Sequence, residues 1–478
     1  MAGTLLAAPA GEFRARRRAY SRWTVNFLAI TTFLYGLILS FTLPWTVQEA
    51  LFAPGSGLVG HGPLAMAWGA FLVVIGALVM LRWLAVQALA FYEHDRLRRK
   101  PAAPLAEAPF VSILVPAFNE SETVVGALTS LIALDYPNYE IIFVDDGSTD
   151  DTFVKAFALA GTYADCTLRV YTKPNGGKWS SLNFAYHKSK GDLLLCVDAD
   201  SGLAKDALSI MVPRIAEEGV VGVSGQVTIR NRHNFLTRLQ AAEYLLGNGG
   251  MRMALSLLGA VTVVPGPIGL YKRDILERIA RIPGTKPPAT AHQGPGAVPG
   301  PLSGETFAED FQLSLSALAL GGRIVYEPRA YAYTKCPDDV ASLMSQRYRW
   351  IRGTWQVYVI YLRTLRKLNK KKAPLLPVVM TVLYPVDIFL VPPLNFFFWI
   401  AIIVSITLGQ SMDFVIGWIV SVSILNVMTA VVYILEQDDE LALAPLVPVL
   451  DLYQSILVNS AWVIAGIDEA RGTRMRWS

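Results

Sequence analysis

The apolar residues of this 478-residue chain are concentrated at its two ends, and this distribution limits the possible folds more than any other feature. Residues 24–47 carry no charge, and residues 64–91 carry only Arg82. Each segment exceeds the roughly 20 residues that a helix needs to cross a bilayer. A cleaved signal peptide has a shorter apolar stretch of about 7–15 residues. We therefore predict two transmembrane helices within residues 24–92, after a basic cytosolic N-terminus at 1–23.

The C-terminal apolar block covers residues 373–467, and the number of crossings in it stays open. Asp387 is the only charge between residues 373 and 412, and Asp451 interrupts the last apolar run. We predict three to four transmembrane or interfacial segments here. The basic tail at 468–478 is expected in the cytosol, which requires four crossings, or two crossings and an interfacial segment.

Basic clusters flank the N-terminal pair of spans on both outer sides, at residues 14–18 and 96–100. The positive-inside rule places both clusters in the cytosol. The protein is thus expected to be a multi-pass protein of the plasma (inner) membrane, with the region after Lys100 cytosolic. The whole chain fits this view, since 53% of its residues are hydrophobic and only 17% are charged, whereas soluble domains have about 25% charged residues.

Charge and cysteine content exclude other classes of protein. A net charge of +4 is too small to indicate a nucleic-acid partner. The three cysteines, Cys166, Cys196 and Cys336, lie far apart and show no CxxC spacing. This argues against a disulfide framework and a thiolate zinc site, and it suits a reducing cytosolic face.

The central region at 108–340 has the pattern of a soluble α/β domain. Short β-rich runs alternate with helical stretches, and this alternation predicts a doubly wound, mostly parallel, Rossmann-like sheet. The predicted strands are Phe110–Pro116, Glu140–Asp146, Thr167–Thr172 and Asp192–Asp198. Ligands of such sheets bind beyond the carboxyl ends of the strands. Residues 283–304, half of them Gly or Pro, are expected to form a flexible loop.

Two acidic motifs follow predicted strands. Asp145 and Asp146 end one strand, and Asp198 and Asp200 end another. Residues i and i+2 of an extended segment point the same way, so Asp198 and Asp200 can converge on one hard cation. Mg²⁺ or Mn²⁺ bound in this way keeps waters and bridges substrate phosphates. The alternative is that both motifs are ordinary turns, which Asp and Gly favour; two such motifs in one sheet make that alternative weaker.

A third acidic motif is Ala308-Glu309-Asp310, at the start of a predicted helix. Glu309 and Asp310 could simply stabilise the positive end of the helix dipole. The functional alternative is a general base that removes a proton from an attacking hydroxyl. The Gly/Pro-rich segment directly before this pair adds weight to a catalytic role for Glu309 and Asp310.

A fourth motif, Gln346-Arg347-Tyr348-Arg349-Trp350, lies in an amphipathic region at 341–372. Gln346, Arg349 and Trp350 share one helical face. A guanidinium binds phosphate through a fork of donors, and an indole offers a flat surface to a sugar ring. The helix could also lie at the membrane interface with Arg and Trp at headgroup level, and the two roles are compatible.

The four motifs, in this order and between membrane spans, resemble the processive family 2 glycosyltransferases, which include bacterial cellulose, hyaluronan, chitin-oligosaccharide and poly-N-acetylglucosamine synthases. Three further stretches support the resemblance: Val115–Glu120 (VPAFNE), Asn175–Lys178 (NGGK) and Pro265–Gly269 (PGPIG). It covers about residues 110–354 and looks most like the poly-N-acetylglucosamine synthases. The implied fold is a GT-A type domain embedded between N- and C-terminal transmembrane helices.

The resemblance also implies a role for each motif residue. Asp145 and Asp146 would hold the nucleoside, Lys178 would lie near the diphosphate, and Gly266 would lie near the acceptor end. Asp198 would contact nucleotide and metal, and Asp200 would be the main metal ligand. Gln346, Arg349 and Trp350 would hold the diphosphate and the acceptor sugar, and Asp310 would be the base. Arg474 would belong to a gating loop, although Arg471 stands where tryptophan usually precedes its Gly-Thr-Arg.

The expected function is an inverting, metal-dependent, processive transfer of sugar from a nucleotide sugar, with UDP-N-acetylglucosamine favoured as donor. The β-linked polysaccharide would leave through the protein's own transmembrane channel, with accessory subunits possible as partners. One alternative is a non-processive transferase that glycosylates a lipid. A transporter or an inactive scaffold fits less well, because no repeat is visible and every proposed catalytic carboxylate is present.

Overall fold

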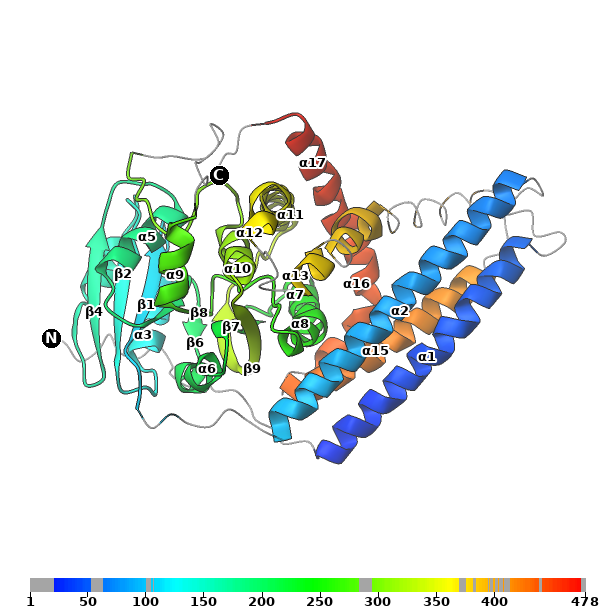
Figure 1. Ribbon diagram of the computed structural model, residues 1–478, viewed down its shortest axis with the longest axis horizontal. Helices are drawn as coiled ribbons and strands as arrows, with labels where there is room; N and C mark the ends of the chain where they lie inside the picture. The colour runs from blue at the N-terminus through cyan, green and yellow to red at the C-terminus, as the bar shows by residue number, and fades with distance from the viewer. Residues whose placement is uncertain are drawn as a thin grey trace.

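The computed structural model describes residues 21–52, 63–99, 105, 107–282, 295–368, 375–380, 384–393, 395, 399, 403, 407, 413–437 and 441–473. An α/β domain occupies one end of the molecule, and long inclined helices occupy the other (Figure 1). The helices α7, α8, α10 and α11 lie between these two parts.

The long helices are α1 (Arg22–Phe52), α2 (Pro63–Arg99) and α15 (Asp413–Gln437). α1 packs against both α2 and α15. One face of α1 exposes Phe27, Ile30, Leu34 and Ile38 at helical spacing. A continuous apolar row of this kind is what a surface in contact with lipid requires.

Three of the described helical stretches are long and apolar enough to cross a membrane: Arg22–Ser40, Ile419–Gln437 and Leu441–Ala470. The first overlaps the span expected at 24–47, and the other two lie within the C-terminal apolar block at 373–467, apart from the last three residues of Leu441–Ala470. The span expected at 64–91 falls within α2. The last stretch comprises a 3-10 turn (Leu441–Leu446), α16 (Val447–Tyr453), a π-helical turn (Gln454–Val458) and α17 (Asn459–Ala470).

The α/β domain is built on a sheet with the order β3-β4-β2-β1-β5-β8-β7-β9-β6. β1 pairs in parallel with β2 and β5, β2 with β4, and β7 with β9, while β8 runs antiparallel to both β5 and β7. The strands are β1 (Val111–Ala117), β2 (Tyr139–Asp145), β3 (Gly161–Thr162), β4 (Cys166–Thr172), β5 (Leu193–Cys196), β6 (Gly202–Leu203), β7 (Val220–Ile229), β8 (Gly269–Lys272) and β9 (Arg323–Thr334).

Both faces of this sheet are buried, as the continuous apolar runs of β1 and β2 require. Alternate residues of β1 enter two separate cores: Val111, Ile113 and Val115 pack on one side, and Leu114 packs on the other. The first core includes α3 (Val124–Ile132) and α6 (Ala207–Ile215), and the second includes α5 (Lys178–Lys188), α9 (Arg273–Ala280) and α10 (Glu309–Ala319). The GT-A type α/β fold expected from the sequence is confirmed.

The remaining described helices are α4 (Thr152–Phe157), α7 (Phe235–Gly247), a π-helical turn (Asn248–Arg252), α8 (Met253–Leu257), α11 (Val340–Ile360), a second π-helical turn (Tyr361–Leu365), α12 (Arg366–Leu368), α13 (Leu375–Val378) and a third π-helical turn (Val386–Leu390). α11 begins where the Asp339 side chain accepts a hydrogen bond from the Ser342 backbone N–H at 2.9 Å, a standard helix N-cap.

A buried charged cluster joins the long helices to the α/β domain. Glu93 of α2 is fully buried and lies 3.7 Å from Arg214 of α6, which lies 3.7 Å from Glu327 of β9. Removing one partner of such a cluster leaves an uncompensated buried charge. The cluster therefore holds the α/β domain at a fixed place beside α2.

Residues 295–304 of the Gly/Pro-rich segment run along α5, and residues 283–294 lie outside the described part of the chain. The Asn183 side chain donates to the carbonyls of Val298 and Leu302 and accepts from the Leu302 N–H, at 2.9–3.0 Å. These bonds hold residues 298–302 against α5, shortly before the chain enters α10.

Candidate active site

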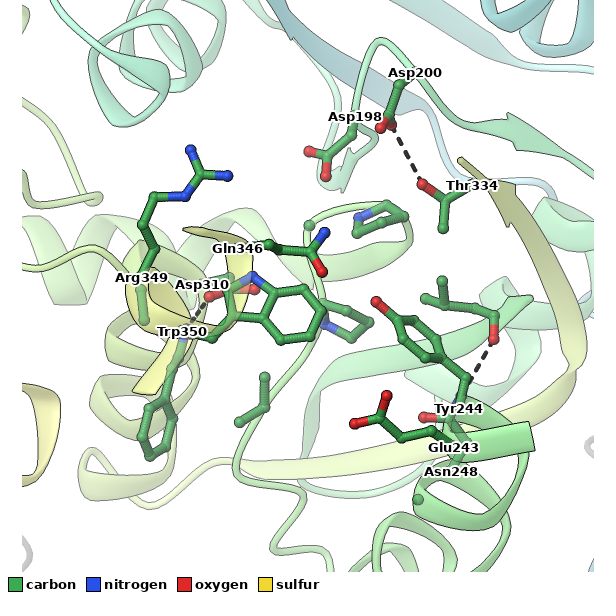
Figure 2. Close-up of a pocket in the computed structure, with 18 of the residues that line it drawn as sticks. Asp198, Asp200, Glu243, Tyr244, Asn248, Asp310, Thr334, Gln346, Arg349 and Trp350 are labelled. Atoms are coloured by element: carbon green, nitrogen blue, oxygen red, sulfur yellow. Dashed lines mark hydrogen bonds between the residues drawn. The ribbon is translucent and has the colours of Figure 1, made fainter. Parts of the chain in front are cut away.

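A cavity of about 970 Å³ opens where the carboxyl ends of β2, β1 and β5 meet the helices. Because β1 lies between β2 and β5, the residues that follow these strands share one edge of the sheet. Figure 2 shows Asp198 and Asp200 at one end of the cavity and Glu243 and Asn248 at the other. Asp146, Lys178, Asp198, Asp200, Gly266, Glu309, Asp310, Gln346, Arg349 and Trp350 all line it.

Asp145 and Asp146 play different structural parts. Asp146 faces the cavity, where its carboxylate contacts Lys173 and accepts hydrogen bonds from the N–H groups of Gly176 and Gly177, at 3.0 and 2.7 Å. Asp145 is buried behind the wall, and its Oδ2 accepts from Ser148 and Thr172. Its Oδ1 has no hydrogen-bond partner among the described residues.

Asp198 and Asp200 form a two-carboxylate set. Thr334 donates to Asp200 Oδ1 at 3.5 Å (Figure 2), and the Lys178 ammonium lies 2.7 Å from Asp198 Oδ1. Burial, and then the charge of Asp198, raises the pKa of the Asp200 carboxyl. A cation placed between the two would relieve this repulsion. The pair thus fits Mg²⁺ or Mn²⁺, which uses one or two carboxylates and completes its shell with water and substrate phosphate.

Glu120, which follows β1, adds a fourth carboxyl to Asp146, Asp198 and Asp200 at this edge of the sheet. Burial raises its pKa to about 7 against a hydrogen bond from Thr123, and the charges of Asp200 and Asp198 add to the rise. Glu120 belongs to the VPAFNE stretch, and no role was predicted for it from the sequence. Its position one strand over from both acidic motifs was the signal that could have identified it.

The part of the cavity beside Asp198 is bounded by Lys178, Glu309 and Gly266. Lys178 Nζ lies 3.3 Å from Glu309 Oε1 as well as touching Asp198. A Cβ on Gly266 would come within 2.6 Å of Lys178 Nζ and 2.9 Å of Asp198 Oδ1. A larger residue at position 266 would therefore push the ends of the Lys178 and Asp198 side chains away from their present positions.

Asp310 sits in the first turn of α10 and lines the middle of the cavity. Its Oδ1 accepts from the Phe311 N–H at 2.7 Å. Burial, and then the charge of Glu309, raises the pKa of Asp310 to about 6, while Lys178 opposes the rise. A carboxyl with this pKa is mostly ionised at neutral pH yet basic enough to accept a proton from a hydroxyl.

One face of α11 supplies Gln346, Arg349 and Trp350. In Figure 2 the Arg349 guanidinium extends toward the end that holds Asp198. Burial lowers the pKa of Arg349, opposed by Glu309, and no ion pair joins Arg349 to another residue in the described chain. An unpaired guanidinium facing a cavity suits a polyanionic ligand.

The Trp350 side chain packs against neighbouring side chains and is also partly exposed to the cavity. The Arg347 guanidinium lies 4.4 Å from its ring centroid and is itself fixed by Glu243 at 2.6 Å. Tyr244 packs at 6.3 Å, between ring centroids. Because Trp350 is still 42% exposed, the indole presents a supported apolar surface to the cavity.

The far end of the cavity is formed by segments that lie far apart in the sequence. Glu243, Tyr244 and Asn248 come from α7 and the turn after it, and Arg252 lies one helical turn further. Asn426 of α15, Asp451 of α16 and Gln454 of the following turn complete the lining. Asn426 donates to Asp451 at 3.4 Å. Only Asp451 had a sequence signal, as a carboxylate within an apolar span.

Of the predicted site residues, the structure brings ten into one cavity and places Asp145 just behind its wall. Arg474 lies outside the described residues. The site therefore combines paired strand-end carboxylates, a buried carboxyl with a raised pKa, a free guanidinium and a half-exposed indole. This is a set suited to transfer of a group from a phosphorylated donor to a hydroxyl acceptor.

Comparison with known proteins identifies the class. Residues 112–280 match the family model described as glycosyl transferase family 2. An N-acetylglucosaminyltransferase of Azorhizobium caulinodans is 31% identical over 313 residues, which cover 64% of this chain and 73% of that protein. The chain belongs to glycosyl transferase family 2 and is a glycosyltransferase.

Two further comparisons extend this result. A poly-beta-1,6-N-acetyl-D-glucosamine synthase of Staphylococcus aureus is 27% identical over 292 residues, 60% of this chain and 65% of that protein. A mannosyltransferase of Pyrobaculum calidifontis, solved in complex with GDP-mannose and Mn²⁺, superposes with a TM-score of 0.51 at 20% identity, over 81% of this chain and 96% of that one. The second likeness shows a shared fold.

Proposed function

We propose that the protein polymerises sugar from a nucleotide-sugar donor into a β-linked polysaccharide, adding many units before release, and that UDP-N-acetylglucosamine is the donor. The relatives with N-acetylglucosaminyltransferase and poly-N-acetylglucosamine synthase names support the choice of sugar. The same cavity supports the reaction, because it joins a phosphate-binding end to a sugar-binding end through one candidate base.

The donor would bind at the strand-end carboxylates. Asp146 faces this end and would contact the nucleoside, and Asp145, buried just behind the wall, would support that part of the site. Asp198 and Asp200 would hold Mg²⁺ or Mn²⁺ against the diphosphate, with Arg349 on its other side. A bound divalent ion neutralises charge that develops on the leaving diphosphate. Arg349 contributes to the same stabilisation through its own hydrogen bonds.

Asp310 would act as the general base. Its carboxylate accepts the proton of the acceptor hydroxyl as that oxygen forms a bond to the anomeric carbon. The bond from this carbon to the diphosphate oxygen breaks, and its electron pair leaves with the nucleotide. A single displacement of this kind inverts the anomeric centre, so an α-linked donor yields a β-linked product.

Trp350 would hold the terminal sugar of the acceptor, and the chain would extend toward Asn426, Asp451 and Gln454. A polysaccharide cannot cross hydrocarbon unless its hydroxyls find partners, and these three side chains offer them within or beside apolar helices. We further propose that the protein is a multi-pass inner-membrane protein with its active site in the cytosol and that the product leaves through the helices.

The observation that carries this proposal is the position of Asp310, between paired carboxylates and the supported indole of Trp350, in a cavity that also touches candidate membrane helices. A lipid glycosyltransferase would need the first two features but not an extended acceptor path. The length of the product therefore separates polymerisation from transfer to a lipid.

The test uses the full chain in lipid nanodiscs with Mg²⁺ or Mn²⁺ and labelled UDP-N-acetylglucosamine, UDP-glucose, UDP-glucuronate or GDP-mannose, supplied singly and in pairs. We expect nucleotide release and long product with UDP-N-acetylglucosamine alone. Transfer of a single sugar would show a lipid glycosyltransferase instead. Long product from another donor would replace the proposed sugar.

A further inference from the structure

The C-terminal end of α17 is tied to α11 by one carboxylate. Glu469 Oε2 accepts a hydrogen bond from Arg352 Nε at 2.9 Å and another from Gln356 Nε2 at 3.2 Å. Arg352 is 3% exposed, and it also donates to the Thr473 carbonyl. None of these three side chains lines the described cavity.

The side-chain oxygen of Gln356 contacts the backbone just before the candidate base, Asp310. Gln356 Oε1 accepts a hydrogen bond from the Phe307 backbone N–H at 3.2 Å. The Arg352 guanidinium lies 5.7 Å from the Phe307 ring centroid. Glu469 is therefore connected, through a single amide side chain, to a peptide three residues before Asp310.

α11 also meets this peptide at van der Waals distance. A Cβ on Gly353 would lie 2.8 Å from Ala308 Cβ and 2.9 Å from Ala308 N. Distances below 3.0 Å cannot be accommodated without moving the backbone. The close approach of Gly353 therefore limits where residues 307–308 can lie relative to α11.

The start of α10 depends on these contacts because it lacks the usual local support. Ala308 is the N-cap residue of α10, and alanine offers no side-chain acceptor to the first turn. The Ala308 N–H is bonded to Thr306 Oγ1 at 3.0 Å within the same loop. The direction in which Asp310 enters the cavity therefore follows the placement of the 307–308 peptide.

We propose that Glu469, Arg352 and Gln356 form a latch that positions Asp310, so that the end of a candidate membrane segment sets the geometry of the base. The three are positioning residues, since none touches substrate. This inference rests on the proposed role of Asp310. The same C-terminal segment lines the acceptor end of the cavity through Asp451 and Gln454, so one piece of chain contacts the acceptor path and aligns the base.

Four variants test the latch in the full chain in nanodiscs. Glu469→Ala removes the shared acceptor, and we expect kcat to fall about 10- to 100-fold with the donor KM within about twofold, since misplacing a catalytic group by about 1 Å costs rate of this order. Glu469→Gln keeps an oxygen for both donors and retains most of kcat. Gln356→Glu sets two carboxylates against each other and loses kcat. The double variant Gln356→Glu/Glu469→Gln restores a donor–acceptor pair, and with it kcat.

Asp468→Ala is the matched control. It removes another contact between the same two helices, the 2.7 Å hydrogen bond that Tyr348 donates to Asp468, and it leaves the bonds of Glu469, Arg352 and Gln356 in place, including the one from Arg352 to the Tyr348 hydroxyl. We expect lower thermal stability with kcat unchanged. A loss of kcat in Asp468→Ala equal to that in Glu469→Ala would overturn the latch, because the effect would then reflect helix packing alone.

Hydrogen exchange makes the test independent of turnover. The peptide that contains residues 305–311 should exchange faster in Glu469→Ala than in the wild type and in Asp468→Ala. Unchanged exchange and wild-type kcat in Glu469→Ala would refute the latch, as would failure of the double variant to recover. If the wild-type protein transfers no sugar, the proposed function fails, and exchange at 305–311 still decides whether the latch exists.

Discussion

The two ends of the cavity are built in different ways. The donor end, where the nucleotide sugar is proposed to bind, consists of carboxylates that follow neighbouring strands of one sheet, all within 81 residues from Glu120 to Asp200. The acceptor end, where the growing chain is proposed to bind, is formed by α7, α11, α15 and α16, which come from more than 200 residues of chain. Carboxylates dominate the first end, whereas the second combines an indole and amides with the charged side chains of Glu243, Arg252 and Asp451.

Because the two ends are built differently, we expect variants at each end to change different measured quantities. Variants at the donor end remove electrostatic terms that act on the breaking bond, so they change the rate of nucleotide release with every acceptor. Variants at the acceptor end remove stacking and hydrogen bonds to the chain, so they change product length more than the rate of release. Asp310, which lies between the two ends, should affect both.

The largest effect is expected from Asp310→Asn. The amide keeps the size of the side chain but cannot accept the hydroxyl proton, so we predict a loss of about 10²–10⁴-fold in kcat. Donor binding, measured by calorimetry, should stay within about threefold. Turnover at the wild-type rate in this variant would remove Asp310 from the mechanism.

The second-largest effect is expected from weakening the proposed divalent-cation site. Asp200→Asn weakens the two-carboxylate set, and we predict a fall of about 10²–10³-fold in nucleotide release, in the range found when one electrostatic contributor is removed. Chelation of the wild type should abolish release, and added Mg²⁺ or Mn²⁺ should restore it. The control is Glu122→Gln, a highly exposed carboxylate outside the cavity. Full activity after chelation would contradict the proposed metal site.

The pH dependence of kcat follows from Asp310. Its pKa is raised to about 6, and a base works only when deprotonated. At saturating donor, kcat should therefore rise with pH through about 6 and fall about tenfold per unit below it. In Glu309→Gln the neighbouring negative charge is gone, the pKa of Asp310 falls, and the limb should move to lower pH. If the acidic limb of the pH profile did not shift in Glu309→Gln, the limb would have to be assigned to a group other than Asp310.

The donor end could be predicted from the sequence because strand ends and their polar residues are local features. Asp146, Asp198 and Asp200 each follow an apolar run, and parallel pairing brings such ends to one edge. Glu120 has the same relation to β1 and could have been included on the same argument. The α/β sheet was likewise predictable from the alternation of strands and helices.

The acceptor end could not be predicted in this way, because contacts between distant helices depend on tertiary packing. The helical period placed Gln346, Arg349 and Trp350 on one face, but nothing in the spacing showed that Arg347 would pack beneath Trp350 and pair with Glu243. The approach of Asn426 and Asp451 to this site also depends on how α15 and α16 pack. The Gly/Pro content of residues 295–304 gave no indication of their hydrogen bonds to Asn183.

The smallest predicted effect tests the acceptor end alone. Trp350→Ala removes the indole surface, and aromatic contacts of this kind contribute about 0.5–1.5 kcal/mol, or roughly two- to tenfold in an equilibrium. We therefore expect shorter product, by a factor in this range, with nucleotide release in the first turnover nearly unchanged. Trp350→Phe should keep most of the length, because Arg347 and Tyr244 still support a ring at this position. Product length is read on a gel or by mass spectrometry, and first-turnover release by rapid quench. If Trp350→Ala instead slowed first-turnover release as much as Asp200→Asn did, the two ends would act as one unit, and the division between chemistry and chain length would be wrong.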